Sequence, residues 1–317
     1  MVRRQKRIRK RKRTRIRTLI LCLLFSVLSL AGWKMGLLEQ FFPGGKAKPS
    51  ATVPERYRTD QMPADLFGYL LIDCLDVGQG DCTLICQGDH AMLFDCGGEI
   101  PMIIRSHLRR QGVAAIEGVW LSHGDRDHIY SFPSVAYAYD IGRVYTNGRN
   151  KNTDAWQYAM DTISRKGIPL TVPAPGDVFD LGDARIEVLG PLKADEEEEN
   201  NNSLVIRIVY GDTAVLLTGD AEYPEEMDIA GSGRNIQADI LHAGHHGSNS
   251  SSSREFLRKV SPVFAVVSCG ENNDYGHPGE HALERLSGCG AYILRTDENG
   301  TIRFLSDGNT IRYYTGE

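Results

Sequence analysis

Residues 122–128, Ser-His-Gly-Asp-Arg-Asp-His, constrain the fold most, because they place four metal-ligating side chains within six residues. The preceding residues 118–121, Gly-Val-Trp-Leu, are apolar and rich in strand formers, so they predict a buried strand. The ligands then lie on the loop that leaves this strand, where the backbone can aim several side chains at one point. Histidine nitrogen and aspartate oxygen together suit divalent metals. The alternative, a polar surface loop with two chance histidines, is disfavoured because later segments supply the missing partners.

The charge of the chain is strongly asymmetric. Residues 1–17 carry eleven Lys or Arg and no acid, whereas residues 51–317 carry a net charge of −18. We therefore expect the basic tail and the acidic body to meet different surroundings. An acidic body argues against binding of a polyanion, which usually needs a basic face. Candidates for a local basic strip near the ligand loop are Arg105, Arg109, Arg110, Arg143, Arg149 and Lys151.

A run without charged residues follows the basic tail, from Thr18 to Trp33. It is shorter than the ~20 residues that span a bilayer core, but Trp33 and a snorkelling Lys34 lengthen the span. A cleaved signal peptide is the alternative, disfavoured by the long basic stretch and the lack of a small-x-small cleavage site. Lys and Arg residues that flank a membrane span remain on its cytoplasmic side. We thus predict a single-pass protein of the cell membrane, with a basic cytoplasmic tail (1–17), a transmembrane anchor (18–38), a linker (39–65) and an extracytoplasmic domain (66–317).

The body alternates short apolar runs with helical patterns, and many of the runs end in polar loops. Strands are expected at residues 69–77, 82–86, 91–95 and 118–121, and a hairpin at 203–217. Asn299-Gly300 predicts a second hairpin, joining Tyr292–Arg295 to Thr301–Leu305. This pattern indicates an α/β sandwich with its site along one edge of the sheets. Six cysteines lie outside the anchor, and their apolar runs favour core positions, although disulfides are allowed.

Seven short motifs follow one another along the body. They are Leu75-Asp-Val-Gly-Gln-Gly-Asp81, Phe94-Asp-Cys-Gly-Gly98, His-x-Asp-x-Asp-His at 123–128, Asn201-Asn-Ser-Leu204, Leu217-Thr-Gly-Asp220, His245-His-Gly-Ser248 and Tyr275-Gly-His-Pro278. In this order they resemble the metallo-β-lactamase-fold hydrolases, and within them most the hydrolase domain of ComEC-type competence DNA-uptake proteins. The resemblance covers about residues 68–306 and implies a four-layer αβ/βα sandwich with one or two metal ions at the sheet edge. One anchor segment cannot form a DNA pore, so a role in uptake does not follow from the resemblance.

The resemblance also implies roles for individual residues. His123 and Asp125 would bind a first metal, Asp127 and His128 a second, and Asp220 would bridge both. The last ligand would be His245 or His246, and the family's pattern of His followed by Gly slightly favours His246. The usual third ligand of the first metal, a histidine near residues 200–203, is replaced by asparagine, so we expect a weak first site.

Further residues are expected around these ligands. Asp81 and Asp95 would lie behind the ligands, where a carboxylate orients a metal-binding loop; for Asp95, a strand-end cap is an equal alternative. Asn202 and Ser248 are expected to contact the substrate. His277 would protonate the leaving group or bind the substrate, with a purely structural histidine as the alternative.

Two divalent ions about 3.5–4 Å apart can hold a bridging water and lower its pKa towards 7. Asp220 suits the bridge because it offers two anionic oxygens, and Asp127 is needed to hold the second ion in catalysis. The expected ligand set contains three Asp and three His, and this share of oxygen ligands favours Mn²⁺ slightly over Zn²⁺.

These observations predict a membrane-anchored, extracytoplasmic, metal-dependent hydrolase that uses a metal-bound hydroxide. A phosphodiesterase or nuclease is favoured, with a phosphodiester or nucleic acid as substrate. One alternative is a hydrolase of another cell-surface ester or a lactam, which the acidic body favours. The other is a non-enzymatic domain that binds metal for structure or sensing.

Overall fold

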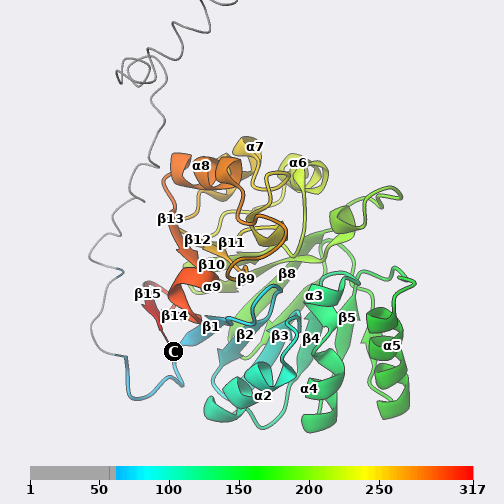
Figure 1. The fold of residues 1–317 in the computed structure, drawn as a ribbon. Coiled ribbons are helices and arrows are strands. Elements are labelled where there is room, and N and C mark those ends of the chain that lie inside the picture. The colour runs from blue at the N-terminus through cyan, green and yellow to red at the C-terminus, as the bar shows by residue number, and fades with distance from the viewer. Residues whose placement is uncertain (1–56, 58–61, 317) are drawn as a thin grey trace, which may run out of the picture. The chain divides into compact units, whose positions relative to one another are not determined.

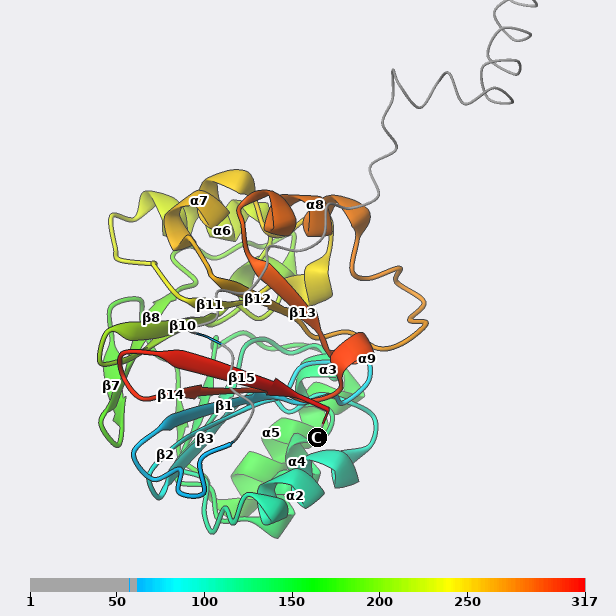
Figure 2. The ribbon, with the colours of Figure 1, turned by 90° about the vertical axis from the view of Figure 1, so that its left-hand side faces the viewer.

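The computed structural model describes residues 57 and 62–316, so the expected tail and anchor lie outside the described residues. Two β-sheets face each other, and helices cover the outer face of each (Figures 1 and 2). This arrangement confirms the expected four-layer αβ/βα sandwich. Within residues 57 and 62–316, no helix combines the length and the apolar character that crossing a membrane requires.

The first sheet has eight strands in the order β15-β14-β1-β2-β3-β4-β5-β6. Its outer face is covered by three helices, α2 (Pro101–Arg110), α4 (Phe132–Ala138) and α5 (Asp154–Lys166). The strands are β1 (Leu70–Cys74), β2 (Thr83–Gln87), β3 (His90–Phe94), β4 (Gly118–Leu121), β5 (Val144–Thr146), β6 (Leu170–Thr171), β14 (Ile302–Ser306) and β15 (Ile311–Thr315).

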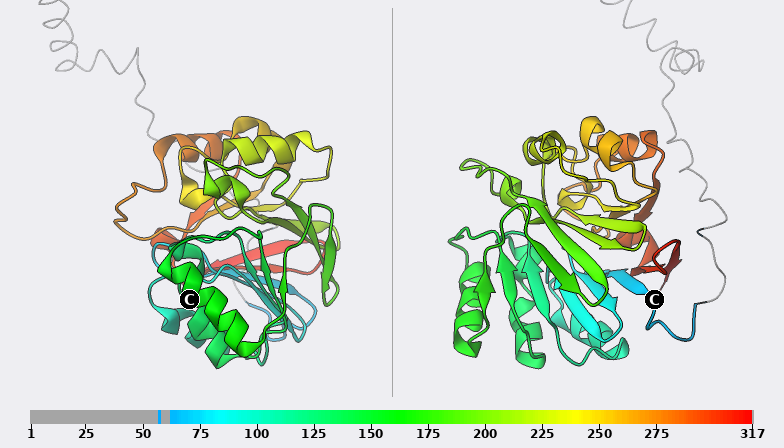
Figure 3. Two further views of the ribbon diagram at one scale, coloured as in Figure 1. Left: turned by 90° about the vertical axis from the view of Figure 1, so that its right-hand side faces the viewer. Right: turned by 180° about the vertical axis from the view of Figure 1, so that it is seen from behind.

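The second sheet has seven strands in the order β13-β12-β11-β10-β9-β8-β7. Its outer face is covered by α6 (Tyr223–Gly231), α7 (Arg254–Val260) and α8 (Glu280–Gly288), as Figure 3 shows from two further sides. The strands are β7 (Val178–Leu181), β8 (Ala184–Gly190), β9 (Val205–Tyr210), β10 (Thr213–Leu217), β11 (Ile240–His242), β12 (Phe264–Val267) and β13 (Tyr292–Arg295).

The helices form where apolar residues recur at helical spacing between clear end signals. In α5, the Thr153 side chain accepts a hydrogen bond from the Trp156 amide, and Gly167 ends the helix with a φ of 65°. Trp156 and Ile163 lie on one face and are buried against the first sheet. Because this face packs on β4 and β5, α5 supports the loop that follows β4.

The expected hairpin at 203–217 is confirmed, since β9 and β10 pair antiparallel. The hairpin expected around Asn299-Gly300 is wrong, because β13 pairs with β12 in the second sheet whereas β14 pairs with β1 in the first. A short helix, α9 (Thr296–Asn299), carries the chain from one sheet to the other. The turn signal was real, but each flanking strand buries its apolar side chains by pairing with a distant strand.

The core between the sheets is aromatic on the β4 side, where the Trp120 and Tyr145 rings stack at 3.9 Å. All six cysteines between residues 74 and 289 are free thiols, and most are buried. The large apolar contact between sheets holds the strand ends in fixed positions. The loops at one edge of the sandwich are thereby brought face to face.

Candidate metal centre

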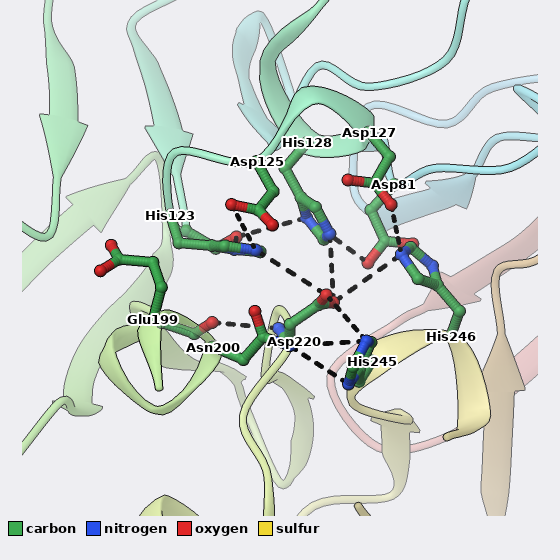
Figure 4. Close-up of polar contacts among 12 residues, drawn as sticks. Asp81, His123, Asp125, Asp127, His128, Glu199, Asn200, Asp220, His245 and His246 are labelled. Carbon is green, nitrogen blue, oxygen red and sulfur yellow. Dashed lines mark hydrogen bonds and ion pairs between the residues drawn. The ribbon is translucent and has the colours of Figure 1, made fainter. Parts of the chain in front are cut away.

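The polar side chains of the candidate site come from loops that meet at one edge of both sheets (Figure 4). The segment after β4 runs through Ser122–Asp125 into a one-turn helix, α3 (Arg126–Ile129). Asp81 precedes β2 and Asp95 follows β3, both in the first sheet. The second sheet contributes the loops after β10 and β11. Segments far apart in the sequence therefore converge, as the motif order led us to expect.

Asp220, on the loop after β10, lies at the centre of this cluster. Its Oδ1 is 3.1 Å from His128 Nε2 and 3.8 Å from His246 Nε2. Its Oδ2 is 3.7 Å from His123 Nε2 and 3.8 Å from His245 Nε2. A buried carboxylate facing four imidazoles on two sides can bind an ion and bridge to a second group.

Within the described part of the chain, four groups of three side chains bring ligand atoms within 4.8 Å of one another. Several of these atoms are buried without a hydrogen-bond partner among the described residues, including both oxygens of Asp81, Asp220 Oδ1 and the Nε2 atoms of His123 and His128. Buried polar atoms are rarely left in this state, so the donor set fits a divalent cation. The groups are His123–His128–Asp220, Asp127–His128–His246, Asp81–Asp220–His246 and Asp81–Asp95–His128.

Asp95 holds the ligand loop in place. Its carboxylate accepts hydrogen bonds from the Ser122 amide (2.7 Å) and the Ser122 hydroxyl (2.8 Å). It also lies 2.8 Å from His128 Nδ1. A carboxylate there fixes the proton on Nδ1 and leaves Nε2 free to face Asp220 and a metal. This placement fits the orienting role expected for Asp95.

Asp81 lies closer to the centre than the sequence led us to expect. It belongs to two of the four groups, and its Oδ1 is 3.6 Å from both His246 Nδ1 and His242 Nε2. Its position follows from a very close approach of two backbones: the Asp81 amide donates to Asp127 O at 3.0 Å. A Cβ on Gly97 would lie 1.5 Å from Asp127 O, so only glycine allows this approach.

The protonation of His123 and of the carboxylates suits metal binding. Burial, together with the neighbouring His128, lowers the pKa of His123 to about 3, so its imidazole is neutral. Burial opposes ionisation of Asp220, but His128 and His246 still hold the pKa of this carboxyl well below its usual value. Burial likewise opposes ionisation of Asp127, yet the hydrogen bond from His246 lowers its pKa to about 2. Neutral imidazole and anionic carboxylate are the forms that bind metals. Burial opposes protonation of His128 and His246, but Asp220 and the neighbouring carboxylates raise the pKa of both well above the usual value, so these two imidazoles must lose a proton when an ion binds.

The two adjacent histidines after β11 face different partners. His246 Nδ1 donates to Ser268 O at 3.0 Å, which turns Nε2 towards Asp127 at 3.2 Å. His245 Nδ1 instead lies 2.9 Å from Glu222 Oε1. His246 belongs to two of the four groups and His245 to none, which places His246 as the nearer ligand candidate. Both have a φ above 50°, a strained backbone that occurs mainly at functional sites.

The remaining expected residues lie around this centre. The His277 ring is 5.3 Å from the His245 ring, and burial, with the neighbouring His245 and His246, lowers the pKa of His277 to about 4. The Ser248 hydroxyl is 2.8 Å from Ser250 Oγ. Contrary to our expectation, Asn202 does not face the centre, because its amide bonds to its own loop at Asp195.

Sequence reasoning missed the contacts of three nearby side chains. Glu222, two residues after Asp220, holds His245, and the short spacing was the only signal for it. Lys151 contacts Asp125, whereas the sequence named Lys151 only as a candidate for a basic strip near the ligand loop. Asn200, rather than Asn202, reaches His245, with Nδ2 at 3.3 Å from Nδ1. These partners come from separate loops, so only the tertiary structure brings them to the centre.

Comparisons with known proteins agree with this geometry. The family model described as "Metallo-beta-lactamase superfamily" matches residues 75–271. ComE operon protein 3 of Bacillus subtilis (strain 168) is 29% identical over 252 residues, which are 74% of this chain and 32% of that protein. Competence protein ComA of Neisseria gonorrhoeae is 31% identical over 262 residues, 78% of this chain and 33% of that protein. The chain thus spans about a third of the length of these curated relatives.

Among solved structures, the metallo-beta-lactamase fold protein YhfI from Bacillus subtilis matches with a TM-score of 0.51. It is 14% identical, and the match covers 75% of this chain and 99% of that one. At this level of sequence identity, the structural similarity shows only that the two proteins share a fold.

Proposed function

Because the chain belongs to the metallo-beta-lactamase superfamily and is a metal-dependent hydrolase related to competence proteins, we propose that it is a phosphodiesterase acting on nucleic acid. The observation that carries this proposal is the convergence of carboxylates and imidazoles on Asp220 at the sheet edge. A divalent ion bound there supplies Lewis acidity and lowers the pKa of a coordinated water. Mn²⁺ and Zn²⁺ both fit the mixed oxygen and nitrogen donors.

The residues of the chain have separate tasks in this proposal. Asp127, His128, Asp220 and His246 hold the ion, and Asp95 keeps His128 oriented. His277 lies at the rim of the centre, stacked on Tyr275 with ring centroids 5.8 Å apart. Its low pKa favours a neutral imidazole that binds the substrate over one that donates a proton.

A cavity of about 390 Å³ beside Asp127 is the place for the organic part of the substrate. Two tyrosines, Tyr130 and Tyr275, line it, and the Arg126 guanidinium carbon lies 3.8 Å from the centre of the Tyr130 ring. Tyr275 is 69% exposed, so its ring is open to a ligand that enters the cavity. Aromatic and arginine planes of this kind stack on nucleobases.

The names of the curated relatives support a nucleic-acid substrate, since the Neisseria gonorrhoeae protein is called a competence protein. The charge of the body favours a second candidate, a small phosphoester or another ester. The net charge of residues 51–317 is −18, and Arg149 is neutralised by ion pairs with Glu196 and Glu199. A long polyanion therefore finds little positive surface here.

We also propose that residues 18–38 anchor the chain in the cell membrane with the hydrolase outside the cytoplasm. The basic residues 1–17 before an uncharged run support this orientation. A phosphodiesterase so placed meets extracellular or periplasmic nucleic acid rather than the cytoplasmic pool.

Hydrolysis of bis(p-nitrophenyl) phosphate by the full chain in detergent, with added Mn²⁺ or Zn²⁺, tests the activity. We expect turnover that Asp127→Ala abolishes. Asp161→Ala is a matched control, because Asp161 is exposed on α5 and pairs only with Arg165 among the described ion pairs. Wild-type turnover by Asp127→Ala would refute the assignment of the active site. Inhibition by single-stranded DNA supports the nucleic-acid substrate, and its absence favours the small ester.

A further inference from the structure

The ligands expected for a first metal ion do not converge as the others do. Within the described residues, none of the four groups of ligand atoms contains Asp125. Its Oδ1 is 3.9 Å from His123 Nε2, and its side chain is about one-third exposed (32%), whereas His123 is fully buried. Asn200 stands where a third ligand would approach, and its amide instead bonds to His245. Asp125 is therefore near His123 but outside every group of converging ligand atoms in the described residues.

A positive charge already meets Asp125. The Lys151 ammonium contacts Asp125 Oδ1, and Lys151 lies between β5 and α5, on the segment beside the ligand loop. Burial lowers the pKa of Lys151, and the nearby carboxylates of Glu199 and Asp220 act against this shift by favouring the ammonium. The ammonium therefore interacts with two of the carboxylates, Asp125 and Asp220, that a first metal ion would need.

The backbone at Gly124 is shaped for the lysine stem. A Cβ on Gly124 would lie 3.0 Å from Lys151 Cβ and 3.4 Å from Lys151 Cδ. Because glycine occupies this position, the stem lies against the ligand loop and its ammonium reaches Asp125. The side chain of Lys151 is 28% exposed, so the stem is packed rather than free in solvent.

We propose that Lys151 takes the place of the first metal ion, so that the centre binds a single divalent ion beside the Lys151 ammonium. The proposal rests on the proposed function, because it takes the cluster around Asp220 to be a metal centre. A second divalent ion next to Asp125 would face the ammonium at close range, and like charges repel strongly in a partly buried site. The single ion would be held by side chains from Asp127, His128, Asp220 and His246.

Lys151 then supplies the positive charge that a second metal gives elsewhere. A lysine ammonium binds phosphate oxygens as a point charge. Together with a bound ion, the Lys151 ammonium would favour an anionic ester over a neutral lactam. This narrows the substrate class of the proposed hydrolase to phosphoesters.

Metal stoichiometry tests the assignment without relying on activity. The full chain is stripped with a chelator, dialysed against buffered Mn²⁺, and analysed by mass spectrometry of the metal. We expect one equivalent for the wild type and two for Lys151→Met, the second bound more weakly through His123, Asp125 and Asp220. Asp125→Asn keeps one equivalent with wild-type affinity, because Asp125 is not a ligand. Lys193→Met is the matched control, since exposed Lys193 pairs with Asp228 on the surface, and it also keeps one.

The outcomes separate this inference from the proposed function. Two equivalents in the wild type, or one in folded Lys151→Met, overturn the role of Lys151. Loss of metal affinity in Asp125→Asn also overturns the role of Lys151. The Asp125→Asn measurement decides for or against that role if Lys151→Met does not fold. No metal bound by any variant refutes the metal centre itself and with it the proposed function.

Discussion

Replacement of Asp95 by Asn tests how the centre is held in its metal-binding form. The carboxylate accepts from the Ser122 amide and hydroxyl and lies 2.8 Å from His128 Nδ1. Asn keeps one acceptor, but its NH₂ group faces the Nδ1–H of His128. That proton then loses its acceptor, at a cost of about 1–3 kcal/mol for a buried donor, or moves to Nε2, the atom that faces Asp220. Loss of such a partner weakens metal binding about 10–100-fold, or about 1.4–2.7 kcal/mol.

Competition with a chelator measures the metal Kd of Asp95→Asn, and urea unfolding of the metal-free chain measures its stability. Asp73→Asn is a matched control, because buried Asp73 also contacts a histidine, His107, at 2.7 Å and two nitrogens of Arg303 at 2.7 Å. Asp73 belongs to none of the four ligand groups in the described chain, so its replacement should destabilise the fold and leave the metal Kd unchanged. Wild-type metal affinity in Asp95→Asn, or an equal loss in both variants, would refute the orienting role of Asp95.

Three further predictions concern backbone approach, substrate binding and topology. Gly97→Ala, whose Cβ would meet Asp127 O at 1.5 Å, should lower activity about 10²-fold by displacing Asp127. Gly68 has open space around it, so Gly68→Ala should keep wild-type activity, and equal activities of the two variants would contradict this prediction. Tyr275→Ala should raise the KM for a dinucleotide about 5–150-fold, because stacking of one base on an aromatic ring contributes ~1–3 kcal/mol. Tyr158→Ala, at another exposed tyrosine, is the control, and an unchanged KM in Tyr275→Ala would show that the substrate does not bind in this cavity. A reporter fused after Glu317 should be active outside the cytoplasm and stay in the membrane fraction; cytoplasmic activity would reverse the orientation, and release into the medium would indicate a cleaved signal peptide.

The site could be predicted from the sequence as far as local spacing carries information. His123, Asp127 and His128 lie within six residues, on the loop after β4 and in helix α3, and the buried strand before them places this segment at a sheet edge. Asp220 follows a strand in the same way. Motif order then suggested that these loops meet, and the structure brings their side chains together.

The sequence by itself determined the strands β1 to β4, the β9–β10 hairpin and the chemistry of the loops, because periodicity and turn residues act over a few neighbouring positions. It did not determine partners, since the segments on both sides of Asn299-Gly300 suit a hairpin and a crossing between sheets equally well. The tertiary structure decided that choice through burial of each strand in a different sheet. It also decided that Asp81 reaches the centre and that Lys151 meets Asp125, because both contacts join loops that become neighbours only once the strands of the first sheet have paired.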